Sequence, residues 1–394
     1  MTKIKNGQSQ IGLFSFFAGA GFLDLGFEAF KEYETIFVNE YHQPFMDIYK
    51  YSRKEMKIRE PQFGYSNEDI CAFLKNDKSK ELTNLINLAR KKFKFIGFIG
   101  GPPCPDFSVG GKNKGIKGEN GKLSETYIDL IISNQPDFFL FENVKGLYRT
   151  KKHKAFFNEI KSRLINHGYI ITEKLVNALE YGAPQDRERI ILIGFKKDIL
   201  LKSRLKTYDS NTLNFLDWNS NATYQVQDIF SKEWPKQETF KENSEKPPPN
   251  GIYINLTVQH WFERNKVENH PNSKHYFTPR AGLPRFKSIC EGDDLKKSFK
   301  RLHRWRYSPT AAYGNNEVHL HPYKARRISA AEALAIQSLP KDFIIPSHIS
   351  LTNMFKTIGN GVPYLMAKGL AETILQFIRK IETKEKTYAE INSQ

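Results

Sequence analysis

Short apolar runs alternate with amphipathic segments through the first half of the chain. The apolar runs have the length and composition of buried strands, and segments such as 23–30 and 155–166 carry apolar residues at helical spacing. Buried strands that alternate with helices predict an α/β fold with a doubly wound, mostly parallel, Rossmann-like sheet. The predicted strands are residues 11–17, 35–39, 95–99, 138–141, 170–176 and 190–195.

This alternation ends after Phe195. Asn, Ser and Pro become frequent there, and three consecutive prolines at 247–249 lie in a polar stretch that is typical of a linker or a surface loop. Helical spacing returns at 329–338 and 363–381. The pattern therefore predicts a second, irregular region that is followed by further helices.

The composition excludes several classes of protein. The chain has 394 residues, with 60 Lys and Arg, 43 Asp and Glu, and a net charge of +17. Cys71, Cys104 and Cys290 are too far apart for a disulfide framework or a CxxC metal site. No apolar run approaches the length of a membrane span. We therefore expect a cytoplasmic protein without a metal site or a membrane anchor.

The positive charge is concentrated in the irregular region. Residues 196–327 hold 24 Lys and Arg against 14 Asp and Glu, and residues 280–306 hold nine of these basic residues. Basic and planar side chains together suit a phosphate backbone and exposed bases. We interpret this region as a candidate nucleic-acid interface, and a solvated basic face is the alternative. The aromatic residues in and beside the densest stretch are Phe286, Phe299, Trp305 and Tyr307.

The first predicted strand leads into a glycine-rich turn. Gly19 and Gly21 form a GxG pattern, in which glycines let a ligand approach the backbone at the start of a helix. Glu40 follows the second strand, where an acid commonly accepts hydrogen bonds from ribose hydroxyls. Phe22 stands in place of a third glycine, which favours a nucleoside ligand without phosphates over a dinucleotide. Asp69 is a candidate for contact with an adenine amino group, with a helix cap as the alternative.

Reactive side chains stand at the ends of the later strands. Cys104 follows the third predicted strand between two prolines, which fix the backbone and so aim the thiol as a candidate nucleophile. Glu142 follows the fourth strand, at the same carboxyl edge of the sheet, as a candidate general acid. Arg187 and Arg189 precede the sixth strand and are two residues apart, so in extended backbone they point to the same side. One of them can hold a carbonyl oxygen of a substrate in this site.

These motifs, in this order, resemble those of cytosine-5 DNA methyltransferases of the bacterial restriction–modification type. They cover both ends of the chain and leave the stretch between Phe195 and about Tyr323 as the variable target-recognition region of that family. The matching segments are FAGAG at 17–21, GPPC at 101–104, ENV at 142–144, QDRER at 185–189 and GNGVP at 359–363.

The resemblance implies an enzyme that transfers a methyl group from S-adenosylmethionine to carbon 5 of a cytosine in a specific duplex DNA sequence, by base flipping and covalent cysteine catalysis. It implies a catalytic domain at 1–196, a smaller, irregular target-recognition domain at 197–325, and a C-terminal segment at 326–394 that returns to the catalytic domain. It assigns catalysis to Cys104, Glu142, Arg187 and Arg189. It assigns the cofactor pocket to Phe17, Ala20, Gly21, Phe22, Leu23, Glu40, Asp69, Ile70, Pro103, Asn360 and Val362.

The resemblance also implies partners and a location. Double-stranded DNA is the expected macromolecular partner, and no membrane is involved. The modification would protect host DNA from a restriction endonuclease, with which the pairing is functional and not necessarily physical. We expect a monomer in a prokaryotic cytoplasm, associated with the nucleoid.

Four residues depart from the pattern of the family, and three alternative functions stay open. Pro105 stands in place of a glutamine, Phe22 of a glycine, Ala331 of an arginine and Gly361 of an alanine or serine. The alternatives are a related enzyme that acts on tRNA, a non-catalytic DNA-binding relative, and a nucleotide-dependent oxidoreductase on the same sheet. The large recognition region favours DNA over tRNA, and the filled catalytic positions favour an enzyme.

Overall fold

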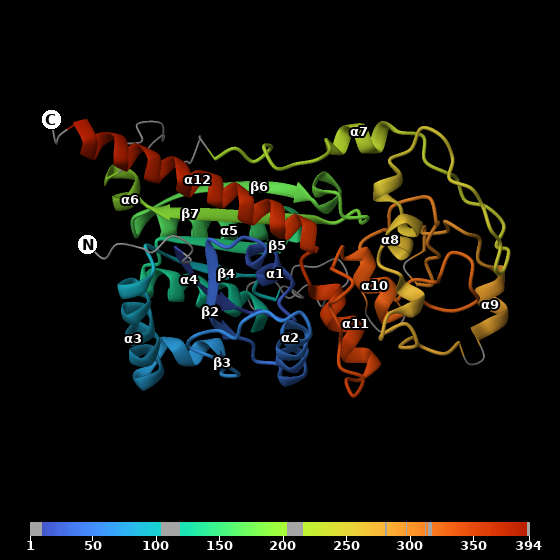
Figure 1. Cartoon of the computed structure of the whole chain (residues 1–394), viewed down its shortest axis with the longest axis horizontal. Helices are drawn as coiled ribbons and strands as arrows, with labels where there is room; N and C mark the ends of the chain where they lie inside the picture. Colours follow the sequence, from blue (N-terminus) through green and yellow to red (C-terminus); the bar gives the residue numbers. More distant parts are fainter. Residues whose placement is uncertain are drawn as a thin grey trace.

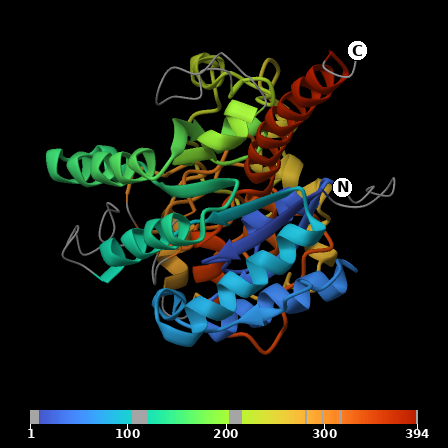
Figure 2. The ribbon, with the colours of Figure 1, turned by 90° about the vertical axis from the view of Figure 1, so that its left-hand side faces the viewer.

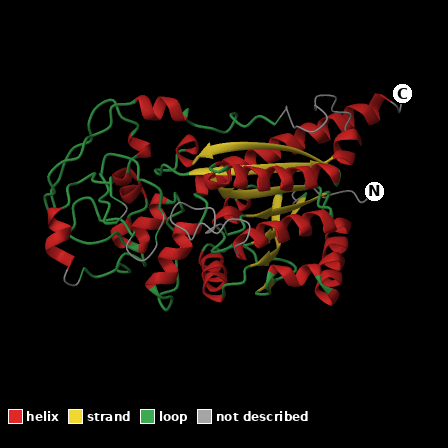
Figure 3. Ribbon diagram, turned by 180° about the vertical axis from the view of Figure 1, so that it is seen from behind, coloured by secondary structure: helices red, strands yellow, loops and turns green. Residues whose placement is uncertain are grey.

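The chain folds into two lobes that lie side by side (Figure 1). The computed structural model describes residues 10–103, 119–202, 216–279, 282–296, 298–311, 313 and 317–391. One lobe is a sheet flanked by helices, and the other consists mainly of loops with short helices (Figure 3). In the part of the chain that is described, no helix combines the length and the apolar character needed to cross a membrane.

A seven-stranded sheet forms the centre of the first lobe. Its strand order is β3-β2-β1-β4-β5-β7-β6. Neighbouring strands from β3 to β5 are parallel, and β7 runs antiparallel to both β5 and β6. The predicted mostly parallel sheet is therefore confirmed. The strands are β1 (Ile11–Phe16), β2 (Tyr33–Asn39), β3 (Tyr65–Ser66), β4 (Phe95–Gly100), β5 (Phe138–Val144), β6 (Tyr169–Asn177) and β7 (Glu188–Lys196).

Helices cover both faces of the sheet, as a doubly wound fold requires (Figures 1 and 2). The long C-terminal helix α12 packs with α1 in the apolar cluster on one face, and α3, α4 and α5 pack in the cluster on the other face. Alternate residues of β1 point into the two clusters, Leu13 into the first and Phe14 into the second. The helices of this lobe are α1 (Phe22–Glu28), α2 (Gln43–Glu55), α3 (Asn76–Lys92), α4 (Glu119–Asn134), α5 (Lys151–Asn166), α6 (Lys197–Lys202) and α12 (Tyr364–Ile391), with 3₁₀ turns η1 (Ile70–Leu74), η3 (Lys145–Tyr148) and η4 (Ala178–Tyr181).

The second lobe is joined to the first by a shared apolar cluster. This cluster combines Phe22 and Leu25 of α1 with Trp261 of α8, Leu334 of α10 and Phe355 of α11. Since α10 and α11 contribute to it, the C-terminal part of the chain contacts both lobes before it returns to the sheet as α12. The remaining elements are α7 (Val226–Ser231), η5 (Ile254–Leu256), α8 (Val258–Arg264), η6 (Val267–Asn269), α9 (Leu283–Ser288), α10 (Ala330–Ile336) and α11 (Leu351–Asn360).

Candidate active site

Four strands bring their carboxyl ends to one edge of the sheet, on the side of the second lobe (Figure 1). The register of the parallel pairs places the last paired residues of β1, β2 and β4 side by side, with the matching residue of β5 next to them. The next residues along these strands are Phe17, Glu40, Gly101 and Glu142. The structure therefore collects the tips of four strands at the edge where open α/β sheets bind ligands.

The turn after β1 is held in a left-handed backbone conformation. Phe17 has a φ of 52°, Gly19 of 57° and Gly21 of 77°. Glycine adopts this conformation freely, whereas for a residue such as phenylalanine it costs about 1–2 kcal/mol. The strand predicted to reach Phe17 consequently ends at Phe16, and Phe17 begins the turn. Among the described residues, nothing lies within 4 Å of the point where a Cβ on Gly19 would stand, so in this part of the structure the turn is open at Gly19.

Glu40 fastens this turn to the tip of β2. One carboxylate oxygen accepts the backbone N–H of Gly19 at 2.8 Å, and the other accepts that of His42 at 2.8 Å. Burial raises the pKa of Glu40, and these two hydrogen bonds oppose that effect. Each oxygen of a carboxylate can accept more than one hydrogen bond, so Glu40 keeps capacity for a ligand hydroxyl.

The segment after β3 forms the next part of the rim. Asn39 donates from its side-chain amide to the carbonyls of Ser66 and Glu68, at 3.2 and 2.9 Å, which holds this segment beside the tip of β2. Asp69 caps η1 by accepting the N–H of Cys71 at 2.8 Å, and its side chain is exposed. Both interpretations of Asp69 are therefore compatible, because a capping carboxylate retains a second oxygen. Of the other predicted pocket residues nearby, Ile70, Ala20 and Leu23 are buried and Pro103 is exposed.

The end of α11 brings residues from the far end of the chain to the first turn. Val362 lies in the same apolar cluster as Leu23. Phe22 is 2% exposed and packs edge-on against Phe343, with ring centroids 5.1 Å apart. A Cβ placed on Gly361 would lie 2.1 Å from the Phe22 ring. Two departures from the family pattern, Phe22 and Gly361, are thus in direct contact. Asn360 ends α11 and is exposed.

Glu142 and Arg189 form an ion pair at the carboxyl edge. Val144 of β5 pairs with Arg189 of β7, which makes Glu142 the diagonal neighbour of Arg189 on the same face of the sheet. Arg189 Nε lies 2.8 Å from Glu142 Oε1, and both side chains are almost buried. The other oxygen, Oε2, would lie 2.6 Å from a Cβ on Gly101, so it faces the first residue after β4. Glu142 therefore has one carboxylate oxygen paired with Arg189 and the other directed toward Gly101, three residues before Cys104 in the sequence.

Arg187 makes different contacts from Arg189. Its side chain is 1% exposed, and its guanidinium donates to the carbonyl of Gly359 at 2.8 Å and that of Ala311 at 3.2 Å. Burial, with the repulsion of Arg189, lowers the pKa of Arg187 well below its ordinary value. In the structure, Arg187 ties the strand tips to the second lobe and to the end of α11, whereas Arg189 faces Glu142.

Two buried glutamines support this junction, and the sequence analysis did not single out Gln337 at all. Gln185 accepts the N–H of Ala311 at 3.0 Å and donates to Gln337 at 3.1 Å. Gln337 in turn donates to the carbonyl of Ile358 at 2.5 Å. The available signal was Gln337 itself, a polar residue directly after the apolar second half of α10, because a buried amide must find hydrogen-bond partners.

The predicted nucleophile Cys104 lies outside the described residues, as does Pro105. The chain is described up to Pro103 and resumes at residue 119. Cys71 and Cys290, which the sequence analysis did not assign to the site, are free and half-buried. Cys71 belongs to η1, and its Sγ lies 3.6 Å from the hydroxyl of Thr126 in α4.

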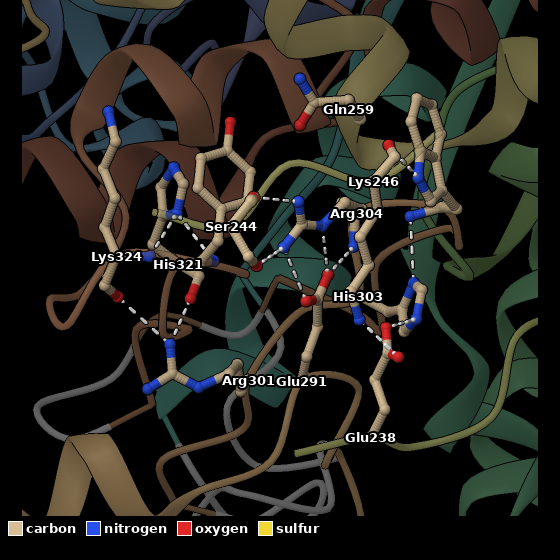
Figure 4. A network of polar contacts seen from close by, with 12 residues as sticks. Glu238, Ser244, Lys246, Gln259, Glu291, Arg301, His303, Arg304, His321 and Lys324 are labelled. Carbon is tan, nitrogen blue, oxygen red and sulfur yellow. Dashed lines mark hydrogen bonds and ion pairs between the residues drawn. The ribbon is translucent and has the colours of Figure 1, made fainter. Parts of the chain in front are cut away.

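Much of the densest basic stretch is taken up by the packing of the second lobe. Arg301 is fully buried and donates to main-chain carbonyls, including those of Ile289 and Lys324 at 2.9 and 3.1 Å. Arg304 forms a bidentate ion pair with Glu291, with both N–O distances 2.9 Å (Figure 4). Phe286 and Trp305 are buried as well. Charge counted along the sequence therefore overstates the basic surface. Exposed basic side chains of this lobe include Lys274, Arg285 and Lys296.

One cluster in this network has the residue types of a metal site. Ligand atoms of Glu238, Glu291 and His303 lie within 4.8 Å of one another. Both oxygens of Glu291 already accept from Arg304, and Glu238 lies 2.5 Å from the ammonium of Lys246 (Figure 4). The negative charge of the cluster is thus balanced by side chains of the lobe itself.

Comparison with known sequences gives matches along nearly the whole chain. The profile of the family described as C-5 cytosine-specific DNA methylase matches residues 11–376. Type II methyltransferase M.NmeDI of Neisseria meningitidis serogroup C is 56% identical over 375 residues, which cover 95% of this chain and 86% of that protein. Type II methyltransferase M.FnuDI of Fusobacterium nucleatum is 30% identical over 382 residues, with coverage of 95% and 98%.

Comparison with solved structures gives the same fold. A putative DNA modification methyltransferase encoded within an E. coli prophage matches with a TM-score of 0.60 and 24% identity, covering 94% of this chain and 99% of that one. The DNMT2 of Spodoptera frugiperda, solved as a triple mutant, matches with a TM-score of 0.55 and 14% identity, covering 92% and 99%. These similarities support the methyltransferase arrangement of the sheet.

Proposed function

The chain belongs to the C-5 cytosine-specific DNA methylase family and is a DNA cytosine-5-methyltransferase of the type II restriction–modification kind, and from this premise we propose how its residues carry out the reaction. The family model describes DNA methylases and the similar sequences are type II methyltransferases, which favours this activity over the oxidoreductase, tRNA and non-catalytic alternatives.

The first turn and its neighbours fit S-adenosylmethionine. The open side of Gly19 leaves room for a ligand close to the backbone, and the carboxylates of Glu40 and Asp69 suit ribose hydroxyls and an adenine amino group. When bound, the cofactor would supply an electrophilic methyl group. The residues that we propose to form the pocket are Phe17, Ala20, Gly21, Phe22, Leu23, Glu40, Asp69, Ile70, Pro103, Asn360 and Val362.

Catalysis begins with a cytosine that has left the DNA stack, because the ring cannot be reached inside a duplex. The thiolate of Cys104 then forms a bond to carbon 6, and Glu142 shares a proton with ring nitrogen 3, so that negative charge does not build up on the ring. Arg189 stabilises the ring carbonyl oxygen. Carbon 5 becomes nucleophilic and gains the methyl group. Loss of the carbon 5 proton then breaks the bond to sulfur and returns the free thiolate.

The Glu142–Arg189 pair is the observation that carries this proposal. Arg189 Nε lies 2.8 Å from Glu142 Oε1, and this charged contact holds the carboxylate in place. Oε2 is directed to Gly101, three residues before Cys104. A cytosine ring placed between Glu142 Oε2 and Cys104 would have the acid at one edge and the nucleophile at another. Arg187 supports the same edge from behind through Gly359 and Ala311.

The second lobe would choose the DNA sequence. We assign the chemistry to residues 1–196, target recognition to 197–325, and support of both to 326–394. The exposed Lys274, Arg285 and Lys296 are candidates for phosphate contacts, which position the duplex, while base edges in the major groove would specify the sequence. Buried Arg301 and Arg304 would act indirectly, by keeping the lobe in shape.

The test of this proposal compares the three cysteines. Transfer of a radiolabelled methyl group to duplex DNA should be lost in Cys104→Ala, while binding of DNA in a mobility-shift assay should stay. Cys71→Ala and Cys290→Ala are the matched controls, since neither residue is placed at the strand tips, and both should transfer methyl groups as the wild type does. Sustained turnover by Cys104→Ala would contradict the covalent mechanism.

Protection of host DNA can be tested in cells. Bisulfite sequencing of genomic DNA from a host that expresses the gene should show one modified sequence motif. The same DNA should resist an endonuclease that cuts this motif and should be cut when the host expresses Cys104→Ala. Cleavage of fully modified DNA would argue against a protective role.

A further inference from the structure

A buried charged cluster lies directly behind the turn that we assign to the cofactor. Arg53 of α2 has a side chain only 2% exposed, and its guanidinium lies 4.1 Å from the centre of the Tyr49 ring. Arg53 also pairs with Glu28 of α1, with Nη2 3.1 Å from Oε2. The hydroxyl of Tyr49 donates to Asp24 at 3.2 Å. Burial of an arginine is costly unless its charge is paired, and Glu28 supplies that charge; both Nη atoms have hydrogen-bond partners, whereas Nε has none among the described residues.

The same guanidinium holds the main chain of the turn. Nη1 donates to the carbonyl of Ala20 at 3.1 Å, and Nη2 donates to the carbonyl of Gly21 at 2.5 Å. These carbonyls belong to the turn that contains the left-handed Gly19 and Gly21. Because Arg53 is almost completely buried, it contacts the turn from the protein interior and not from the surface that a ligand would reach.

Gly21 makes this close approach possible. A Cβ on Gly21 would lie 2.3 Å from the Tyr49 ring and 2.6 Å from Nη2 of Arg53. A side chain at this position would push α2 and its arginine away from the turn. Gly21 therefore has two roles. It allows the left-handed backbone conformation, and its lack of a side chain lets Arg53 and Tyr49 pack directly against the turn.

We propose that Arg53 is a positioning residue for the cofactor turn, so that affinity for S-adenosylmethionine depends on a side chain that does not touch it. This inference rests on the proposed function, which places Ala20 and Gly21 in the cofactor pocket. Two charge-assisted hydrogen bonds from one planar group fix both carbonyls at once. Lysine carries the same charge but has a single point donor on a flexible stem, and so it cannot hold both carbonyls and Glu28 in one geometry.

The experiment compares Arg53→Lys with two controls by calorimetric titration of the whole protein with S-adenosylmethionine. Arg53→Lys should raise the dissociation constant about tenfold or more, which corresponds to roughly 1.4 kcal/mol. The Michaelis constant for the cofactor should rise likewise, while turnover at saturating cofactor should stay near that of the wild type, because Arg53 has no part in the chemical step. Glu28→Gln removes the ion pair but leaves both carbonyl contacts, and it should bind nearly as well as the wild type.

Arg90→Lys is a second control, in helix α3 of the same lobe. Arg90 also pairs with an acid, Asp137, at 3.1 Å and donates to a main-chain carbonyl, that of Gln135, at 2.8 Å, but at the opposite edge of the sheet. The Arg90→Lys variant should leave the affinity for S-adenosylmethionine unchanged. The double variant Arg53→Met with Glu28→Gln removes both charges of the Arg53–Glu28 ion pair, and it should also bind S-adenosylmethionine more weakly than Glu28→Gln alone if Arg53→Lys fails to fold.

The outcomes separate the two claims. If the wild type itself binds no S-adenosylmethionine, the proposed function fails. If the wild type binds and Arg53→Lys binds equally well, the positioning role is overturned. An equal loss of affinity in Arg53→Lys and Glu28→Gln would also overturn it, because general destabilisation would then explain the effect.

Discussion

Phe22 and Gly361 both differ from the family pattern, and they are in contact although they lie far apart in the sequence. From this contact we predict that substitutions at the two positions affect stability in a coupled way. Substitution Gly361→Ala restores a residue that the family pattern has at this position. The backbone itself permits the change, since Gly361 has a φ of −65° and a ψ of 152°, which any residue adopts. The obstacle is the Phe22 ring, which lies 2.1 Å from the position of the new methyl group.

The size of the effect follows from the geometry. The Phe22 ring would have to move by more than an ångström to restore an ordinary carbon–carbon contact. Its movement is restricted, because it packs against Phe343 in a cluster of buried residues. Overpacking of this kind costs about 1–3 kcal/mol. In a protein that already carries Phe22→Ala, the same methyl group would enter space that the ring has vacated, and its cost should fall to near zero or become favourable.

A double-mutant cycle measures this difference. The free energy of unfolding is determined in denaturant for the wild type, Gly361→Ala, Phe22→Ala and the double variant. Phe22→Ala alone should cost about 3–5 kcal/mol, because it leaves a cavity. The cycle should show a coupling of about 1–3 kcal/mol in favour of the double variant. Additive effects would refute the reasoning, since they would mean that the ring and the new methyl group do not compete for space.

Two further predictions concern buried carboxylates. Burial raises the pKa of Asp24 to about 6 from 3.8, with the nearby Glu28 adding to the effect and Arg53 opposing it, so the native state binds the proton more tightly than the unfolded chain. The stabilisation gained from this proton is therefore present at low pH and is lost as the pH rises through 6. In denaturant unfolding, Asp24→Asn should be more stable than the wild type by about 3 kcal/mol at pH 8, and this difference should narrow toward pH 4. A difference in the free energy of unfolding that does not vary with pH would contradict this prediction. Glu142→Gln should lower methyl transfer by about 10²–10⁴-fold without weakening cofactor binding. The control is Glu188→Gln, since Glu188 is half-buried and pairs with Lys145 instead of Arg189, and it should be nearly unaffected in the same radiolabel assay. Similar losses in both would argue against Glu142 as the proton donor.

The sheet could be predicted because its signal is local. Each long strand is an apolar run between polar residues, so observed and predicted strands differ by one to three residues at most ends, as for 190–195 against Glu188–Lys196. β3 was missed, because two residues, Tyr65 and Ser66, are too short to show any period. The helix predicted at 155–166 began late against Lys151–Asn166, since the first turn of α5 after its Thr150 cap consists of polar residues and shows no apolar spacing.

The site was predictable where it lies at strand tips and unpredictable where it depends on contacts across the fold. Glu142 and Arg189 could be placed together because each adjoins a predicted strand. Arg53 could not, since it is one basic residue of 60 and its contact with Gly21 forms only when α2 packs on the turn. The buried Arg301 shows the same limit, because composition counts a charge but does not say which way it points.

The measurement that tests the central claim most directly is trapping of the covalent intermediate. A duplex with 5-fluorocytosine at the methylated position, incubated with the protein and S-adenosylmethionine, retains fluorine where a proton must leave, so the bond to sulfur cannot be broken. We predict a protein–DNA adduct that survives denaturation and maps by mass spectrometry to Cys104, and none with Cys104→Ala. Methylation of the ordinary duplex without any adduct on the fluorinated one, or an adduct at another residue, would contradict the account.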